Sequence, residues 1–125
     1  MLQDRVLRVQ ALRNGKKVGG AAGIDTNGSF TAESYDAAAL IVLAIQAGNS
    51  ADRSSIAKNV MAVANGPGKK IYPGQLKKAL YLLKRGKEVD YEGATAVNFT
   101  DVGEAVGSFL EKEVKGGKFK TKKER

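Results

Sequence analysis

The residue types that enzymes use most often are absent from this chain. It contains neither histidine nor cysteine. Without imidazole, the commonest general base and the commonest transition-metal ligand are both missing, and without a thiol there is neither a disulfide nor a thiolate nucleophile. Triad hydrolysis and most zinc sites are therefore excluded. We expect a protein that is not an enzyme and that carries no cofactor.

Carboxylates spaced two residues apart are the next groups that could do chemistry. Asp90 and Glu92 form one such pair, and Glu111 and Glu113 form another. Period-two spacing can place both members of a pair on one face of a strand, but no nucleophile or electrophile accompanies either pair. We interpret both pairs as solvated strand faces.

Three glycine-containing segments resemble ligand loops without meeting their requirements. Segment 66–70, GPGKK, lacks the spacing and the following Ser or Thr of a phosphate-binding loop. Segment 19–23, GGAAG, is not spaced as a dinucleotide fingerprint, and segment 25–28, DTNG, lacks the closing glutamate of a calcium loop. We interpret them as a helix stop followed by a turn, a flexible linker and a turn, and we expect no metal site.

The charge balance is strongly basic. The chain has 21 basic and 13 acidic side chains, a formal net charge of +8, which favours anionic surfaces by long-range attraction. The densest basic run extends from Lys115 to Arg125 and contains only Phe119 as an aromatic. Because aromatic interleaving is missing, we favour a solvated terminus with a basic tail over residues 122–125, and a nucleic-acid partner is the less favoured interpretation.

Neither an export signal nor a membrane span is expected. Asp4, Arg5 and Arg8 lie where a secretory signal needs an uninterrupted apolar region, so the chain as written is expected in the cytoplasm. The longest apolar run, Ala37 to Ile45, is about half the length that crosses a bilayer. A length of 125 residues with 42% hydrophobic residues suits one compact core.

The first quarter of the chain predicts a helix and a loop. Leu2, Val6, Val9 and Leu12 recur at near-helical spacing and favour a helix, although a strand is the alternative. Residues 13–29 are rich in glycine, which predicts a long flexible connection.

Three helices are predicted next. The first, 31–46, begins with acceptors and negative charges and is then apolar nearly all round, so it should be the core helix and be covered on several sides. The second follows a cap at Ser50 or Asp52 and stops at 65–67. The third begins at Pro73 and ends at Gly86, with its lysines facing outward.

After these helices the pattern changes to strands. We predict strands over 94–100, 108–114 and 118–121. Gly116 and Gly117 tolerate the positive φ angles of a hairpin turn, so the last two strands should form a C-terminal hairpin. The expected fold class is therefore α/β, three helices followed by short strands.

Two long segments resemble a known family. FTAESYDAAALIVLAIQAG, from Phe30, is similar to a helix that family members write as an aromatic residue followed by Tyr-Asp-Ala and an apolar stretch. Downstream, a Pro-Gly helix, DYEGA and a closing hairpin follow in the family's order. The family is the type I periplasmic binding proteins of the branched-chain amino-acid ABC transporter group. The resemblance covers about residues 30 to 119 and departs at Ala96, where the family usually has glycine.

The resemblance implies a fold, a ligand and a location. It divides the chain into an N-terminal helix and Gly-rich loop over 1–29, a binding-protein-like segment over 30–121 and the tail. Family members hold an amino acid between two doubly wound α/β lobes in the periplasm. By position, Phe30 matches an aromatic that can wall the apolar side of that cleft, and Tyr35 matches a tyrosine close behind it. Ordinary aromatic packing is the alternative role for both.

About two thirds of a full-length member is missing, so the resemblance implies a partial, doubly wound fragment that cannot bind solute as a lone monomer. The apolar helix would normally lie on a parallel sheet supplied by preceding sequence, and we expect that sheet to be absent. Its uncovered face would then meet a second copy, which implies a homo-oligomer. The alternatives are an engineered or repurposed self-associating module without ligand and, third, a basic nucleic-acid-binding module.

Overall fold

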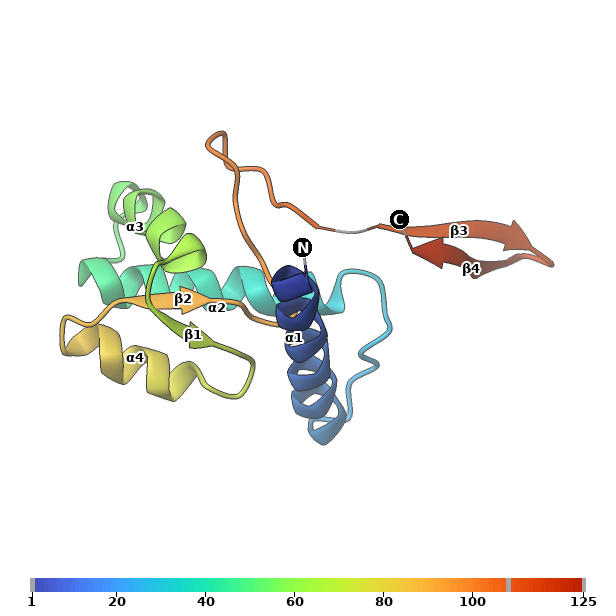
Figure 1. Ribbon diagram of the computed structural model, residues 1–125, viewed down its shortest axis with the longest axis horizontal. Helices are drawn as coiled ribbons and strands as arrows, with labels where there is room; N and C mark the ends of the chain where they lie inside the picture. The colour runs from blue at the N-terminus through green and yellow to red at the C-terminus, as the bar shows by residue number, and fades with distance from the viewer. Residues whose placement is uncertain (1, 108, 125) are drawn as a thin grey trace.

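The described part of the chain combines four helices with two separate two-stranded sheets. A computed structural model describes residues 2–107 and 109–124, without the side chains of residues 2–5. Its mixed α/β composition with a C-terminal hairpin is the predicted fold class (Figure 1). In chain order the elements are α1 Leu2–Ala21, α2 Thr31–Gly48, α3 Arg53–Asn65, β1 Lys69–Ile71, α4 Leu76–Lys84, β2 Val89–Tyr91, β3 Leu110–Lys115 and β4 Lys118–Glu124.

Helix α1 is confirmed but runs well into the predicted flexible loop. Residues 13–21 are helical, and the helix ends just before Gly23, which has a φ of +72°. A Cβ built on Gly15 would lie 2.8 Å from the Cβ of Ala94. The glycine therefore allows the helix to approach another segment closely, and the prediction of a loop over 13–21 was wrong because glycine there serves packing.

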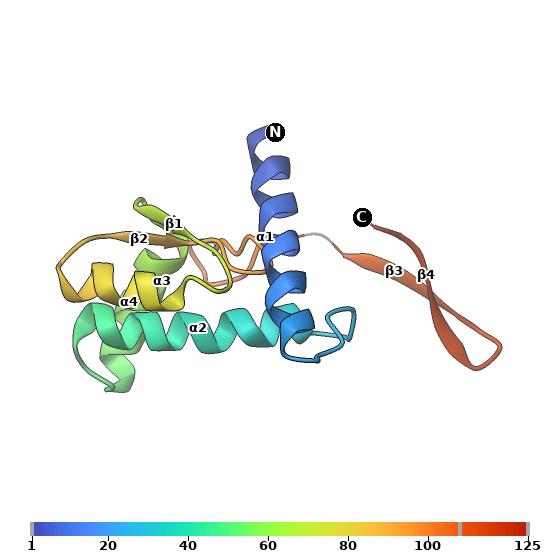
Figure 2. The ribbon, with the colours of Figure 1, turned by 90° about the horizontal axis from the view of Figure 1, so that it is seen from below.

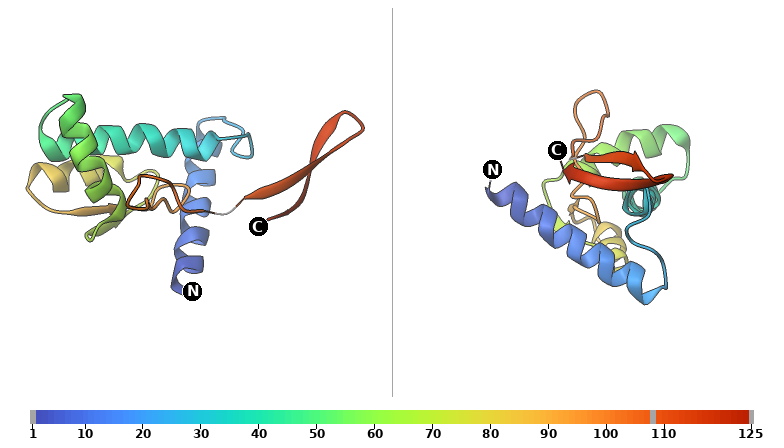
Figure 3. Two further views of the ribbon diagram at one scale, coloured as in Figure 1. Left: turned by 90° about the horizontal axis from the view of Figure 1, so that it is seen from above. Right: turned by 90° about the vertical axis from the view of Figure 1, so that its right-hand side faces the viewer.

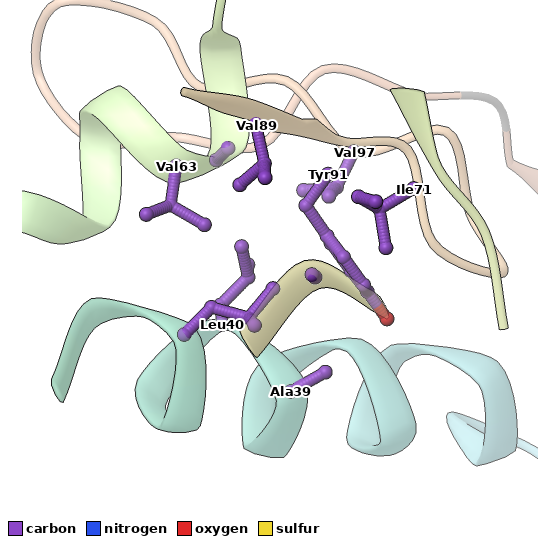
Figure 4. Close-up of a cluster of buried hydrophobic side chains, with 10 residues drawn as sticks. Ala39, Leu40, Val63, Ile71, Val89, Tyr91 and Val97 are labelled. Carbon is purple, nitrogen blue, oxygen red and sulfur yellow. The ribbon is translucent and has the colours of Figure 1, made fainter. Parts of the chain in front are cut away.

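Strands β1 and β2 are parallel and joined by α4, which makes a β-α-β unit. Lys69 pairs with Val89 and Ile71 with Tyr91. These two strands were not predicted, since three residues are too few to show an alternating pattern. One face of the pair carries Ile71, Val89 and Tyr91 onto the buried side of α2 (Figure 4).

The strands beneath α2 correct the expectation of a missing sheet. Leu40 and Leu43 of α2 are buried, in one cluster with the side chains of β1 and β2. The opposite side of the helix is different, because Ile41 is 47% exposed and Val42 is 44% exposed. The core helix is thus covered on one side by a small sheet of its own chain and left uncovered on the other.

Helix α3 follows Asp52 and ends before Gly66, as the stop signal at 65–67 predicted. Helix α4 begins at Leu76, three residues later than expected, because Gly74 adopts a φ of +87° in a turn. That turn is closed by the backbone N–H of Tyr72, which donates to Oε1 of Gln75 at 2.9 Å.

The predicted strand over 94–100 was wrong. This segment forms turns, with one isolated bridge between Phe99 and Ala105. Ala96 adopts a φ of +53°, a left-handed conformation that glycine accepts more easily. Backbone amides of this segment donate hydrogen bonds to a side chain of α2, described below, and do not pair in a β-sheet.

The C-terminal hairpin is confirmed. Strands β3 and β4 pair antiparallel, and Gly116 and Gly117 form the turn with φ angles of +61° and +75°. Residues 122–124, expected as a basic tail, lie within β4. The hairpin projects away from the helices and the parallel strands (Figures 1 and 2). No helix in the described residues has both the length and the apolar content of a membrane span.

Candidate functional site

A charged trio lies on the parallel strands. Nζ of Lys70 on β1 is 2.5 Å from Oδ2 of Asp90 on β2 and 2.9 Å from Oε1 of Glu92 just after it. The two carboxylate side chains are only 9% and 2% exposed, whereas that of Lys70 is 43% exposed. The interpretation of Asp90 and Glu92 as a solvated strand face was therefore wrong.

Strand pairing explains how the trio forms. The parallel register places Lys70 directly beside Asp90, and the two-residue period brings Glu92 to the same face. Side chains at the alternate positions, Val89 and Tyr91, point to the other face, onto α2 (Figure 4). Sequence reasoning missed the trio because the lysine is 20 residues from Asp90 and only the parallel ladder joins them.

The electrostatics of the trio favour a second positive group. The hydrogen bond to Asp90 raises the pKa of Lys70 above its ordinary value; burial opposes this rise and Glu92 adds to it. Two carboxylates share this one ammonium, and Oδ1 of Asp90 and Oε2 of Glu92 are buried without a hydrogen-bond partner. Such oxygens accept hydrogen bonds most strongly from a cationic donor such as an ammonium or guanidinium group.

The trio lies toward the carboxyl ends of the strands, the edge at which open α/β sheets bind ligands. Tyr72 follows β1 there, and its pKa is raised by burial and then by the negative charge of Glu92. Within the described residues, no group of three or more acidic side chains gathers in a way that could hold a metal ion.

Asp36 forms a second buried polar centre, which is fully engaged. Its carboxylate accepts hydrogen bonds from the Tyr91 hydroxyl at 2.8 Å, from the Ala94 N–H at 2.8 Å, and from the N–H and hydroxyl of Thr95 at 2.9 and 2.6 Å. Burial, followed by the charge of Asp36, raises the pKa of Tyr91. A Cβ on Gly93 would lie 2.3 Å from Oδ1 of Asp36.

These contacts make Asp36 a structural clamp between α2 and the segment after β2. All of its hydrogen-bonding capacity is spent on the protein, so it has none left for a ligand. Sequence reasoning assigned Asp36 to the negative start of the helix. Residues 90–95, DYEGAT, carry no local signal that their amides and hydroxyls donate hydrogen bonds to a single carboxylate.

The two predicted site residues lie at the start of α2. Phe30 precedes the helix with a φ of +59° and its side chain is 74% exposed. Tyr35 is half-buried, and its hydroxyl accepts a long hydrogen bond, 3.4 Å, from the N–H of Gly74. The structure therefore brings Tyr35 against the turn that follows β1 and leaves Phe30 on the surface. Their role as ligand contacts stays a prediction.

A shallow cavity of about 250 Å³ lies at the opposite end of the parallel strands. This volume is smaller than the roughly 300–1,000 Å³ of typical small-molecule sites. Neither predicted site residue contributes to it. Its lining comes from the ends of α2, α3 and α4 and from the start of β2: Ala47, Asn59, Ala62, Val63, Gly66, Pro67, Leu83, Gly86, Lys87, Glu88 and Val89.

Similarity to known proteins points to a class. A parallel β-α-β unit with an apolar helix on its sheet is the building block of doubly wound α/β proteins. The chain is 34% identical over 82 residues to the chemotactic signal transduction system substrate-binding protein BasB of Halobacterium salinarum. The matched stretch covers 65% of this chain and 20% of that relative. No family model and no solved structure matches the chain.

A stretch of this chain is thus related to part of a substrate-binding protein. That relationship confirms the periplasmic-binding-protein resemblance at the level of the class. The chain spans about a fifth of the relative's length, so the activity of such a whole protein comes to this chain only as a proposal.

Proposed function

We propose that this chain forms part of the solute-binding unit of a substrate-binding protein whose ligand is an amino acid. The similarity over 82 residues to a substrate-binding protein carries the proposal. The parallel β-α-β unit of β1, α4 and β2 supports it, because binding-protein lobes are built from such units. The function is binding and delivery, to an ABC permease or to a chemotactic receptor, without catalysis.

In this proposal Phe30 and Tyr35 form the apolar side of the solute cleft. The exposure of the Phe30 side chain supports this role, since an aromatic held at the surface by a left-handed backbone is available for contact. Tyr35 lies one helical turn further and is oriented by the Gly74 N–H. The preference for a branched-chain solute rests on the resemblance to the branched-chain amino-acid group, and the apolar character of these two side chains is compatible with it.

The chain by itself supplies only one wall of such a cleft. The parallel sheet has two strands of three residues each. Neither the cavity of about 250 Å³ nor the more open hollow at Gly48 and Lys58 is lined by Phe30 or Tyr35. A second wall must come from further protein. The isolated 125-residue chain should therefore bind amino acids at most weakly.

A chimera tests this function directly. The stretch of the Halobacterium relative that matches this chain is replaced by the chain's own sequence, and solute binding by the purified chimera is measured by calorimetry with a panel including leucine and valine. Retained binding that weakens at least tenfold on Phe30→Ala supports the proposal. A folded chimera that binds none of the solutes bound by the relative contradicts it.

The isolated chain serves as the second arm of the experiment. Titration of the 125-residue protein with the same panel should give no saturable heat at micromolar concentrations. Micromolar affinity for leucine or valine would show that the chain holds a complete cleft and would overturn the one-wall description.

A further inference from the structure

The chain contains three asparagines that are each followed by glycine, at residues 14–15, 27–28 and 65–66. An asparagine in this position can lose its side-chain amide without an enzyme, because glycine has no side chain to keep its backbone nitrogen away from Cγ of the asparagine. The three pairs share this local chemistry. The structure around each pair therefore decides which of them reacts.

Two of the three asparagines are held by the fold. Asn14 lies inside α1, and its Oδ1 accepts a hydrogen bond from Nε2 of Gln10 at 2.8 Å. Asn65 ends α3, and its Nδ2 donates to the carbonyl oxygen of Phe99 at 3.0 Å while its Oδ1 accepts from the N–H of Phe99 at 2.8 Å. At both places Cγ can turn toward the following nitrogen only if these hydrogen bonds break.

Asn27 lies in a different environment. It belongs to the connection between α1 and α2, which both views of Figure 3 show at the boundary of the molecule, and Asn27 and Gly28 are both exposed. Within the described residues, the side-chain amide of Asn27 makes no hydrogen bond. The N–H of Gly28 donates to the carbonyl oxygen of Asp25 at 3.2 Å. Only this hydrogen bond of an exposed turn must open before the glycine nitrogen is free to react.

We propose that Asn27 is a site of spontaneous deamidation, at which the backbone nitrogen of Gly28 attacks Cγ of Asn27. A bond forms between this nitrogen and Cγ, the bond from Cγ to Nδ2 breaks, and the proton of the glycine N–H leaves with the ammonia. Solvent water then opens the five-membered imide at either carbonyl carbon and leaves aspartate or isoaspartate at position 27. The reaction needs no solute and goes beyond the proposed binding function.

Both products change the turn that precedes α2. Aspartate places a second carboxylate two residues after Asp25, and isoaspartate also adds one carbon atom to the backbone. The turn is closed on the carbonyl oxygen of Asp25, which accepts from the N–H of Gly28 and from the hydroxyl of Thr31 at 3.3 Å. A longer backbone does not fit this closure. Isoaspartate at position 27 therefore alters the segment that leads directly to Phe30.

Incubation of the 125-residue protein in mildly alkaline buffer made with heavy-oxygen water tests the proposal. Mass spectrometry of its proteolytic peptides locates the heavy acid oxygen at each asparagine. In the folded protein Asn27 should gain this oxygen at least about tenfold faster than Asn14 or Asn65, because reaction at those two requires local opening of the structure. In urea the three asparagines should react at similar rates, since only their shared local chemistry remains.

The variant Asn27→Gln is the matched control. It keeps a side-chain amide at this position, but attack by the following nitrogen would have to close a larger, six-membered ring. The intact folded variant should keep its mass over the period in which wild type is modified, and circular dichroism checks that both proteins remain helical.

Four results would overturn the proposal. They are equal rates at the three asparagines of the folded protein, faster reaction at Asn14 or Asn65 than at Asn27, no reaction at Asn27 while the protein in urea reacts, and a preference for Asn27 that persists in urea. The last result would show that the sequence around Asn27 selects it and that the fold does not.

Discussion

Individual buried carboxylates explain much of how this small chain holds together. Asp36 accepts hydrogen bonds from four donors, one on Tyr91 of β2 and three on the segment after it, which satisfies its charge completely. Asp90 and Glu92 receive one ammonium between them and keep two unpartnered oxygens. The first arrangement stabilises the fold. The second leaves more negative than positive charge, so its stability depends strongly on the ammonium of Lys70.

Removal of the positive charge of Lys70 should destabilise the protein more than removal of the positive charge of Lys69. Lys70→Met leaves both buried carboxylates without a cation, and since the ammonium is partly solvated we expect the free energy of unfolding to fall by about 2 kcal/mol. Lys69→Met, at an exposed position of the same strand, should change it by less than about 0.5 kcal/mol. Urea denaturation followed by circular dichroism measures both, and equal effects would contradict the trio.

Stability should decline in alkaline solution. The pKa values of Lys70 and Tyr91 are raised in the folded state above their ordinary values of 10.5 and 10.0, so the folded state keeps both protons when the unfolded chain begins to lose them. Their contribution is fully present below about pH 10 and is lost as the pH rises further.

Tyr91→Phe isolates the tyrosine part of this loss. The variant should be less stable at neutral pH, because Asp36 loses one donor. Above pH 10, however, its unfolding free energy should fall less steeply than that of wild type, by up to about 1.4 kcal/mol per pH unit. Tyr81→Phe, at an exposed position, is the control and should keep the wild-type slope. Urea unfolding at several pH values supplies the data, and identical slopes for all three proteins would refute the assignment.

At the scale of elements, two glycines of α1 differ in what surrounds them. Gly15 lies against Ala94 and has no room for a side chain, whereas nothing lies within 4 Å of a Cβ built on Gly20. The first glycine is needed for packing of α1 against the segment after β2. The second only lowers helix propensity.

Alanine substitutions should separate these two roles. Gly20→Ala should raise the free energy of unfolding by about 0.5 kcal/mol, because alanine has the higher helix propensity and meets no neighbour. Gly15→Ala should lower it by about 1 kcal/mol or more, since its Cβ would lie 2.8 Å from that of Ala94. Thermal or urea unfolding ranks the two variants against wild type. An equal gain for both would mean that α1 does not pack on Ala94.

The whole molecule consists of a packed body and a projecting hairpin. The body contains α2, α3, α4 and the parallel strands around one apolar cluster. Strands β3 and β4 pair with each other, and nearly all of their side chains are exposed, among them Val114 and Phe119. A hairpin without a packed face is only marginally stable in water.

Hydrogen exchange should therefore divide the chain into two classes. Amides of β2 and the inner turns of α2 should be the most protected, because they open only with the whole body. Amides of β3 and β4 should exchange at least about 100-fold faster at the same pH, through local opening. Exchange measured residue by residue by NMR tests this, and equal protection of both sheets would show that the hairpin packs on the body or on another chain.

Regular local patterns made part of this fold predictable. The apolar run and its flanking signals fixed α2, the Asn-Gly-Pro stop fixed the end of α3, and two adjacent glycines fixed the C-terminal turn. Each of these signals acts within a few residues of the chain. The same local reasoning failed at residues 94–100, where β propensity is overridden by hydrogen bonds to Asp36.

The sequence by itself determined the helices, the hairpin, the absence of histidine and cysteine chemistry and the resemblance to a substrate-binding protein. Only the tertiary structure decided that Lys70, Asp90 and Glu92 meet, that Asp36 clamps the segment after β2, and that a small parallel sheet covers one side of α2. The physical reason is distance along the chain. Parallel pairing and buried ion pairs join residues separated by a whole helix or more, and no local pattern encodes which of many possible partners they find.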